Sequence, residues 1–198
     1  MESEERLTPG VDLDAEEIRD ADLSGQSAAG GRVVECLLED CDLDEVDLDG
    51  TRLVDVTLRR CRAGSLRAPD GVWQDVVVEG SRLGAVSAHG LEATRLTIRG
   101  GKIDYLNLRD ADLTDLALED CVVEELDLGS ARVRRLRATG VRVRRLDVTR
   151  ADLTDVDLRG VDLDEVTGLA GLAGATISEE QLLRLAPALA AHLRLTVG

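Results

Sequence analysis

An apolar residue stands at every fifth position of the chain from Leu13 to Leu163, without a break in the register. Each of these positions holds Leu, Ile, Val, Ala or Trp. A period of five is neither the 3.6 residues of an amphipathic helix nor the two residues of a half-buried strand. An internal repeat of this kind predicts a solenoid, in which short units stack on one another around a continuous core.

The sequence of the repeat carries a resemblance to a known family. Residues 111–115 and 151–155 both read A-D-L-T-D, and residues 41–45 differ mainly in having Cys for the first Ala. The chain resembles the pentapeptide-repeat family, whose unit is A-(D/N)-L-x-x. The resemblance implies an all-β solenoid: a right-handed quadrilateral parallel β-helix, with four pentapeptides in each coil and a turn at each corner.

The charged residues independently predict a coil of twenty residues. At that spacing acids and bases alternate strictly in several columns. One such column is Glu39, Arg59, Glu79, Arg99 and Glu119. Unlike charges directly opposite each other on neighbouring strands stabilise a sheet by about 0.2–1 kcal/mol, whereas like charges destabilise it. The alternation is lost at spacings of ten or fifteen, so four sides per coil are expected from the charges alone.

One coil has an unusual composition, because residues 131–150 hold eight arginines and a single acid, Asp147. A basic ring could bind nucleic acid. The alternative is that its arginines pair with acids in the coils above and below, and the charge columns favour this second interpretation.

The repeat divides the chain into three parts. Residues 1–10 are polar and are predicted to form a disordered tail. Residues 11–168 form the β-helix. Residues 169–198 form a helical cap and dimerisation segment, with a helix that begins at the capping-box signature Ser178-x-x-Gln181. Pro187 predicts a kink or two short helices.

Composition narrows the environment of the protein. The formal charge of −16 disfavours direct binding to nucleic acid, and no apolar run is long enough to cross a membrane. The four cysteines, Cys36, Cys41, Cys61 and Cys121, lack metal-ligand spacing and are interpreted as buried thiols. With no secretory signal expected, these thiols indicate the cytoplasm.

Trp73 occupies a core position among small residues, and its ring is predicted to point inward.

No catalytic constellation is present, so the protein is predicted not to be an enzyme, and no cofactor or metal is expected. His89 and His192 are isolated from each other and from the cysteines. Pairs of aspartates such as Asp155 and Asp157 could imitate an acid–base dyad. They recur at fixed positions of the repeat, however, and repeat geometry explains them better.

Two functional hypotheses follow, both of them non-enzymatic. The resemblance implies the first: some members of the family mimic B-DNA, bind bacterial type II topoisomerases (DNA gyrase or topoisomerase IV), and modulate or protect them. The second is an acidic interaction scaffold with an unknown protein partner and no mimicry. The predicted partner-binding acids are Asp110, Asp112, Asp115, Asp120, Asp152, Asp155 and Asp157. A homodimer through the C-terminal end is also predicted, with contacts from Leu182, Leu185 and Leu189.

Overall fold

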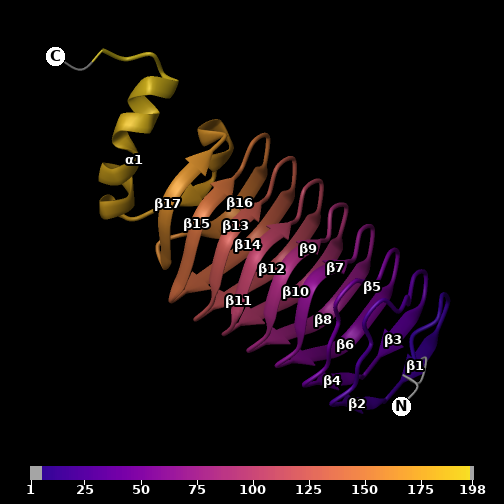
Figure 1. Cartoon of the computed structure of the whole chain (residues 1–198). Coiled ribbons are helices and arrows are strands. Elements are labelled where there is room, and N and C mark those ends of the chain that lie inside the picture. Colours follow the sequence, from indigo (N-terminus) through magenta and orange to yellow (C-terminus); the bar gives the residue numbers. More distant parts are fainter. Residues whose placement is uncertain (1–5, 197–198) are drawn as a thin grey trace.

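The computed structural model describes residues 6–196 and is a parallel β-solenoid that carries one α-helix at its C-terminal end (Figure 1). One sheet, sheet A, contains β1 (Asp12–Asp14), β2 (Glu17–Arg19), β3 (Arg32–Val34), β4 (Leu37–Glu39), β6 (Arg52–Arg59), β8 (Val72–Glu79), β10 (Glu92–Arg99), β12 (Asp112–Glu119), β14 (Arg132–Thr139), β16 (Asp152–Asp157) and β18 (Ala175–Thr176). The other, sheet B, contains β5 (Val46–Asp47), β7 (Arg62–Arg67), β9 (Arg82–Ser87), β11 (Lys102–Asn107), β13 (Val122–Asp127), β15 (Val141–Asp147) and β17 (Val161–Thr167).

The strands pair in parallel at an offset of twenty residues, which confirms the predicted coil length. In sheet A, Val76 lies between Val56 and Leu96. In sheet B, Leu106 lies between Val86 and Leu126. Each coil therefore stacks directly on its predecessor, about 4.8 Å away. Residues twenty apart in sequence are nearest neighbours on the surface of the rod.

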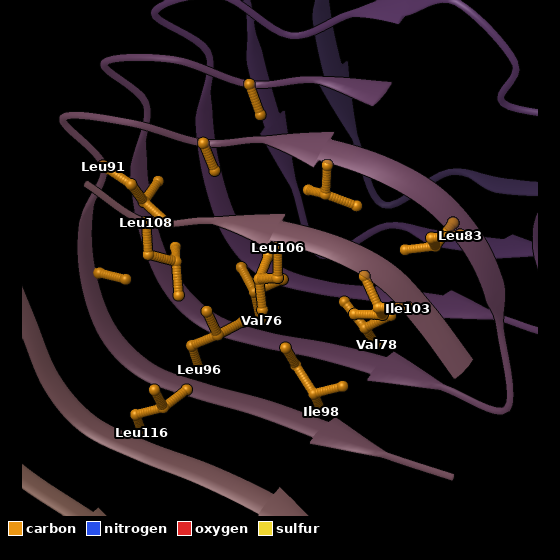
Figure 2. Close-up of a cluster of buried hydrophobic side chains, with 14 of the residues drawn as sticks. Val76, Val78, Leu83, Leu91, Leu96, Ile98, Ile103, Leu106, Leu108 and Leu116 are labelled. Atoms are coloured by element: carbon orange, nitrogen blue, oxygen red, sulfur yellow. The ribbon is translucent and has the colours of Figure 1, made fainter. Parts of the chain in front are cut away.

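The core is a column of aliphatic side chains inside the coils (Figure 2). The central residue of each unit and the residue two places earlier both point inward, as Leu113 and Ala111 do at 1% exposure each. Figure 2 shows Val76, Leu96 and Leu116, which come from successive strands of sheet A, on one wall of this interior. Burial of such side chains contributes about 1.5–3 kcal/mol each and is the main force that holds the coils together.

The chain turns a corner every five residues, and most corner residues adopt a positive φ. Asp115 (φ 60°) and Asp120 (φ 47°) stand at the two ends of one unit. Asp and Asn enter this left-handed region more readily than most residues with a Cβ, which accounts for the many acids at these positions. Glycine occupies others, such as Gly140 with φ 64°.

Trp73 points into the core, as predicted, and is 5% exposed. It lies between Leu53 and Ala93 on the adjacent coils. Within its own unit the small residue is Gly71, where a Cβ would lie 2.8 Å from Trp73 Nε1. The indole N–H has no hydrogen-bond partner within residues 6–196. The large ring is therefore accommodated by small neighbours, at the expense of one unsatisfied donor.

The N-terminal segment differs from the predicted tail. Leu7 is buried at 3% exposure and belongs to the core cluster. The backbone N–H groups of Arg6 and Leu7 both donate to Oε1 of Gln26, at 3.0 and 2.9 Å. Residues 6–10 thus pack on the first coil because Leu7 covers apolar side chains there. Residues 1–5 of the predicted tail lie outside the described residues.

The solenoid also extends beyond residue 168, where the cap was predicted to start. A 3-10 helix, η1 (Leu169–Leu172), is followed by β18, which pairs with β16 through Val156–Ala175 and Asp157–Thr176. This offset is nineteen residues, one fewer than elsewhere, because the last unit departs from the five-residue repeat. The cap proper is α1 (Glu179–His192), a single helix that includes Pro187 rather than two short ones.

Candidate partner-binding surfaces

All seven predicted partner-binding aspartates lie on the side of the rod formed by sheet A. Asp112 and Asp115 belong to β12, and Asp152, Asp155 and Asp157 belong to β16. The other two, Asp110 and Asp120, stand at the corners that precede and follow β12. They form two groups, one on β12 with its corners and one on β16. The strand between the two groups is β14.

Three of these seven carboxylates are engaged in close ion pairs. Asp112 contacts Arg132 at 3.1 Å and Arg134 at 2.7 Å. Asp115 accepts two hydrogen bonds from Arg135, at 2.6 and 2.8 Å. These three arginines all belong to β14, directly above β12. These arginines therefore partly neutralise the negative charges of Asp112 and Asp115.

Asp157 is the third, and its partner, Arg159, lies two residues later in the turn after β16. Nη2 of Arg159 lies 2.7 Å from its carboxylate. Hydrogen bonds from the side chain and backbone of Arg159 lower the pKa of Asp157 to about 2. In the same way, the hydrogen bond from Arg135 lowers the pKa of Asp115. Both carboxylates remain ionised throughout the neutral range.

The remaining four acids are less constrained. Asp152 is 3.8 Å from Arg132, at the edge of ion-pair distance. Asp110, Asp120 and Asp155 form no ion pair with any residue in the range 6–196. These three carboxylates are available to a partner without first breaking an internal contact.

The arginine ring of residues 131–150 mostly pairs with its neighbours, as the charge columns predicted. Besides the three arginines of β14 just described, Arg145 binds Glu125 and Arg142 lies 3.8 Å from Asp164. Arg137, Arg144 and Arg150 form no ion pair with the described residues, but they lie on different sides of the coil. The unpaired guanidinium groups are therefore not gathered on one face.

Along the rod, charge is arranged in bands rather than in a stripe. Residues 11–50 contain fourteen acids and two arginines, a net charge of −12. The next bands are residues 51–110 at +3, 111–130 at −7, 131–150 at +7 and 151–180 at −7. We call residues 11–50 the acidic collar. The sequence analysis did not single it out, although a running sum of charge per coil would have found it.

The collar surrounds the rod. Four of its acids are exposed and form no ion pair with residues 6–196. These are Glu16, Asp20, Glu35 and Glu45. Asp20, Glu35 and Glu45 stand at three different corners, each with a positive φ. A partner that embraces this end of the rod would meet uncompensated carboxylates on several sides.

Comparison with known proteins agrees with this architecture. The family model described as "Pentapeptide repeats" matches residues 17–62 in 8 copies. The chain contains pentapeptide repeats. No curated protein sequence matches it. A trypsin-treated form of QnrB1, a plasmid-mediated fluoroquinolone resistance protein, is 17% identical with a TM-score of 0.49, over 95% of this chain and 100% of QnrB1.

A second similar structure is HetL, a pentapeptide-repeat protein involved in the regulation of heterocyst differentiation in the cyanobacterium Nostoc sp. strain PCC 7120. It is 16% identical with a TM-score of 0.24, over 86% of this chain and 90% of HetL. The presence of pentapeptide repeats rests on the family model that matches residues 17–62, not on these two likenesses.

The most deeply buried acid within residues 6–196 is Glu39, whose side chain is 7% exposed. Arg19, Arg59 and Arg60 all contact its carboxylate, with Arg60 Nη2 at 2.8 Å. Burial alone would raise the pKa of Glu39, but hydrogen bonds from Arg60 and Arg59 outweigh it, and the pKa is lowered. Glu39 therefore links neighbouring coils through these ion pairs and is not available to a partner.

The cysteines are buried, as predicted, and are between 1% and 2% exposed. The thiol of Cys41 donates to the carbonyl oxygens of Ile18 and Glu39, both at 3.4 Å. Burial raises the pKa of Cys61 to about 11. Thiols of this kind are poor nucleophiles. Within residues 6–196, no cluster of His, Cys, Asp or Glu could hold a metal ion.

The three leucines predicted to mediate dimerisation have different surroundings. Leu185 is 8% exposed and packs within the chain, and Leu189 is half-buried. Leu182 is 49% exposed, and its neighbour Leu183, which the sequence analysis did not select, is 75% exposed. The leucines that a second molecule could reach on this part of α1 are therefore Leu182 and Leu183.

Gln181 attaches α1 to the solenoid, a role that its place in the capping box did not predict. It is 3% exposed, and its Nε2 donates to the carbonyl oxygens of Leu158 and Val161, both at 2.7 Å. Its Oε1 accepts from the backbone N–H of Ser178 and completes the capping box. The capping-box pattern located Gln181 but could not indicate that the same amide binds the last coil.

No helix within residues 6–196 is long and apolar enough to cross a membrane.

Proposed function

We propose that the protein is a non-catalytic interaction module whose acidic collar binds a basic surface of a protein partner. The observation that supports this most strongly is the net charge of −12 on residues 11–50, three quarters of the charge of the whole chain. Complementary potentials accelerate association and select partners. The unpaired corner carboxylates Asp20, Glu35 and Glu45 provide the contacts, because they need not leave an internal ion pair to bind.

A charge-neutralised variant tests this proposal. Replacing Asp20 with Asn and both Glu35 and Glu45 with Gln removes three charges at exposed corners. A matched control, Asp110→Asn with Asp120→Asn and Asp155→Asn, removes three charges that form no ion pair within residues 6–196 from coils outside the collar. We expect a partner purified on the wild-type protein to be retained by the control and lost by the collar variant. Equal retention by both variants would contradict a role for the collar.

A second candidate is the DNA mimic that binds a type II topoisomerase. In its favour, Asp110, Asp120 and Asp155 form no ion pair within residues 6–196 and stand at three different corners along the sheet A side of the rod, two of them at its edges. Against it, Arg132, Arg134, Arg135 and Arg137 on β14 interrupt that side between β12 and β16. The basic DNA-binding surface of a topoisomerase would face these positively charged arginines at the place where bound DNA presents negatively charged phosphates. The banding of charge therefore favours the interaction scaffold.

The DNA-mimic hypothesis can be tested separately. Binding to gyrase or topoisomerase IV through exposed carboxylates would weaken steeply with added salt. The Asp110/Asp120/Asp155 variant would then lose inhibition of supercoiling while the collar variant retains it. If the wild-type protein leaves supercoiling, cleavage and drug sensitivity of gyrase unchanged at high micromolar concentration, the mimic is excluded and the scaffold remains.

The proposal also includes self-association through the C-terminal end. Leu182 and Leu183 are exposed on α1, and Leu193 and Leu195 beyond it are 65% and 61% exposed. Two copies meeting at this end would bury these side chains in an isologous interface. The acidic collars would then lie at opposite ends of the assembly, each open to a partner.

A further inference from the structure

A groove of about 320 Å³ runs across sheet B, over β7, β9 and β11. Its floor is bare backbone at Gly64 and Gly84, which lie opposite each other in the strand register. A Cβ at position 84 would lie 2.1 Å from the carbonyl oxygen of Gly64. The depression therefore cannot be filled by a side chain at position 84 unless the backbone moves.

Two cations, Arg82 and Lys102, line the groove and continue a column of cations that begins with Arg62 on the coil below Arg82. Arg62, Arg82 and Lys102 are direct neighbours on adjacent strands. Arg62 Nη2 lies 2.8 Å from Asp42, and Lys102 Nζ lies 3.0 Å from Asp104. Lys102 also contacts Glu124 at 3.0 Å.

The middle cation, Arg82, forms no ion pair with any residue in the range 6–196. Like charges that face each other directly across strands destabilise a sheet. An anion seated in the groove beside Arg82 would relieve this repulsion.

The protein itself shows which anion this backbone accepts. One Oδ1 atom of Asp44, on the coil below, accepts hydrogen bonds from the N–H groups of Gly64 and Ser65 at 2.7 and 2.9 Å. An internal carboxylate thus already sits at the lower edge of the groove. One coil higher, at Gly84, the residue below is Gly64, which has no side chain to play the same part.

We propose that this groove binds a carboxylate-rich segment of a protein partner, with a Glu or Asp side chain seated on the glycine floor and paired with Arg82. A singly charged carboxylate suits the site better than a phosphate dianion, because Asp44 and Asp104 border the groove and repel the extra charge. The residues that line the site belong to coils above the acidic collar, and of the collar Asp44 reaches the groove's lower edge.

The direction of the cation column indicates how such a segment lies. Arg82 and Lys102 are one coil apart, about 4.8 Å, along the rod axis. In an extended peptide, side chains on the same face recur every two residues, about 6.6 Å apart. Flexible Arg and Lys side chains span the difference. A peptide parallel to the rod axis therefore presents alternate carboxylates to Arg82 and Lys102, which predicts an acid-x-acid sequence.

The probe is a short peptide in which Glu and Ser alternate, blocked at both ends, with a Gln-for-Glu peptide as its neutral counterpart. We expect titration into the ¹⁵N-labelled full-length protein to shift the amide resonances of Gly64 and Gly84, and the Gln peptide to leave them unchanged. Arg82→Gln should weaken binding at least tenfold. Arg52→Gln should change it less than twofold, because Arg52 is also exposed and has no ion pair with the described residues but lies on sheet A.

A second variant tests the proposal without removing a cation. Asp104→Asn removes a repelling charge from the rim and should tighten binding of the Glu peptide. Three results would overturn the proposal: absence of shifts at Gly64 and Gly84, equal binding of the Gln peptide, or an unchanged affinity in Arg82→Gln. Tighter binding of inorganic phosphate or of a single-stranded oligonucleotide than of the peptide would overturn it as well, by assigning the groove to phosphate.

Discussion

Gly71 and Trp73 occupy the same cross-section of the rod, with the site of a Cβ on Gly71 only 2.8 Å from the indole Nε1 of Trp73. The pair conserves volume: the widest side chain in the core is matched by the absence of one two residues earlier. Packing density in protein interiors leaves little room for change at such a point.

The first prediction follows from that pair. Gly71→Ala should destabilise the protein by about 1–3 kcal/mol, because the added methyl group overpacks the core. In a Trp73→Phe background, which lacks Nε1, the same substitution should cost less. Urea denaturation followed by circular dichroism measures all four members of the cycle. Additive effects would show that the two residues do not compete for space.

A second prediction tests the inward register. Leu113→Asp should destabilise the fold by about 4 kcal/mol or more, because Leu113 is 1% exposed and a carboxylate there is buried without a partner. Thr114→Asp should be nearly neutral. The Thr114 hydroxyl accepts a hydrogen bond from Arg134 Nε at 3.3 Å, so the new carboxylate meets a cation. Thermal unfolding distinguishes them, and equal melting temperatures would contradict the register.

The third prediction concerns acid. The pKa values of Glu39, Glu79, Asp75, Asp115 and Asp157 are all lowered in the folded protein. The stability that these carboxyls contribute is therefore present in full above their unfolded pKa of about 4. It is lost as the pH falls towards the folded values, which for Asp157 is about 2.

Stability should accordingly decline between about pH 4 and pH 2 and decline less in high salt, where exposed pairs are already screened. Denaturation midpoints across this range provide the measurement. The Arg159→Gln variant should raise the pKa of Asp157 towards its ordinary value in an NMR titration. An unchanged Asp157 titration would show that Arg159 does not set it.

A fourth prediction concerns the attachment of the cap. Gln181→Leu removes the amide that satisfies the carbonyl groups of Leu158 and Val161, and a buried group left unpaired costs about 1–3 kcal/mol. Amide hydrogen exchange in α1 should therefore accelerate while exchange in β8 to β12 stays unchanged. Gln74→Leu, an exposed change on β8, serves as the control. Unaltered exchange in α1 would mean that Leu185 alone holds the helix.

The fifth prediction tests self-association. Leu182→Glu combined with Leu183→Glu should yield a folded monomer in light scattering, because both side chains are exposed on α1. Val72→Glu with Gln74→Glu adds the same charge on sheet A and should leave the assembly intact. A wild-type protein that is monomeric at high concentration would exclude the dimer.

The sequence predicted those features that depend on period alone. The core positions from Leu13 to Leu163 and the column of Glu39 and Arg59 follow directly from spacings of five and twenty. The convergence of three arginines on Glu39 did not follow, since it depends on how long side chains turn between columns. The contact of Asp44 with backbone amides likewise depends on a missing side chain at Gly64. The nineteen-residue offset at Ala175 lies where the repeat itself fades.

The lengths of the strands indicate that the two ends of the rod differ in stability. At the acidic collar β1 to β5 have only two or three residues each, whereas β6 to β17 have six to eight. In a solenoid each coil is stabilised mainly by its nearest neighbours, so unfolding can start at one end and propagate. Self-repulsion of the collar's carboxylates adds to the bias. The rod should therefore fray from the collar first, and a basic partner bound to the collar should make the protein measurably harder to unfold.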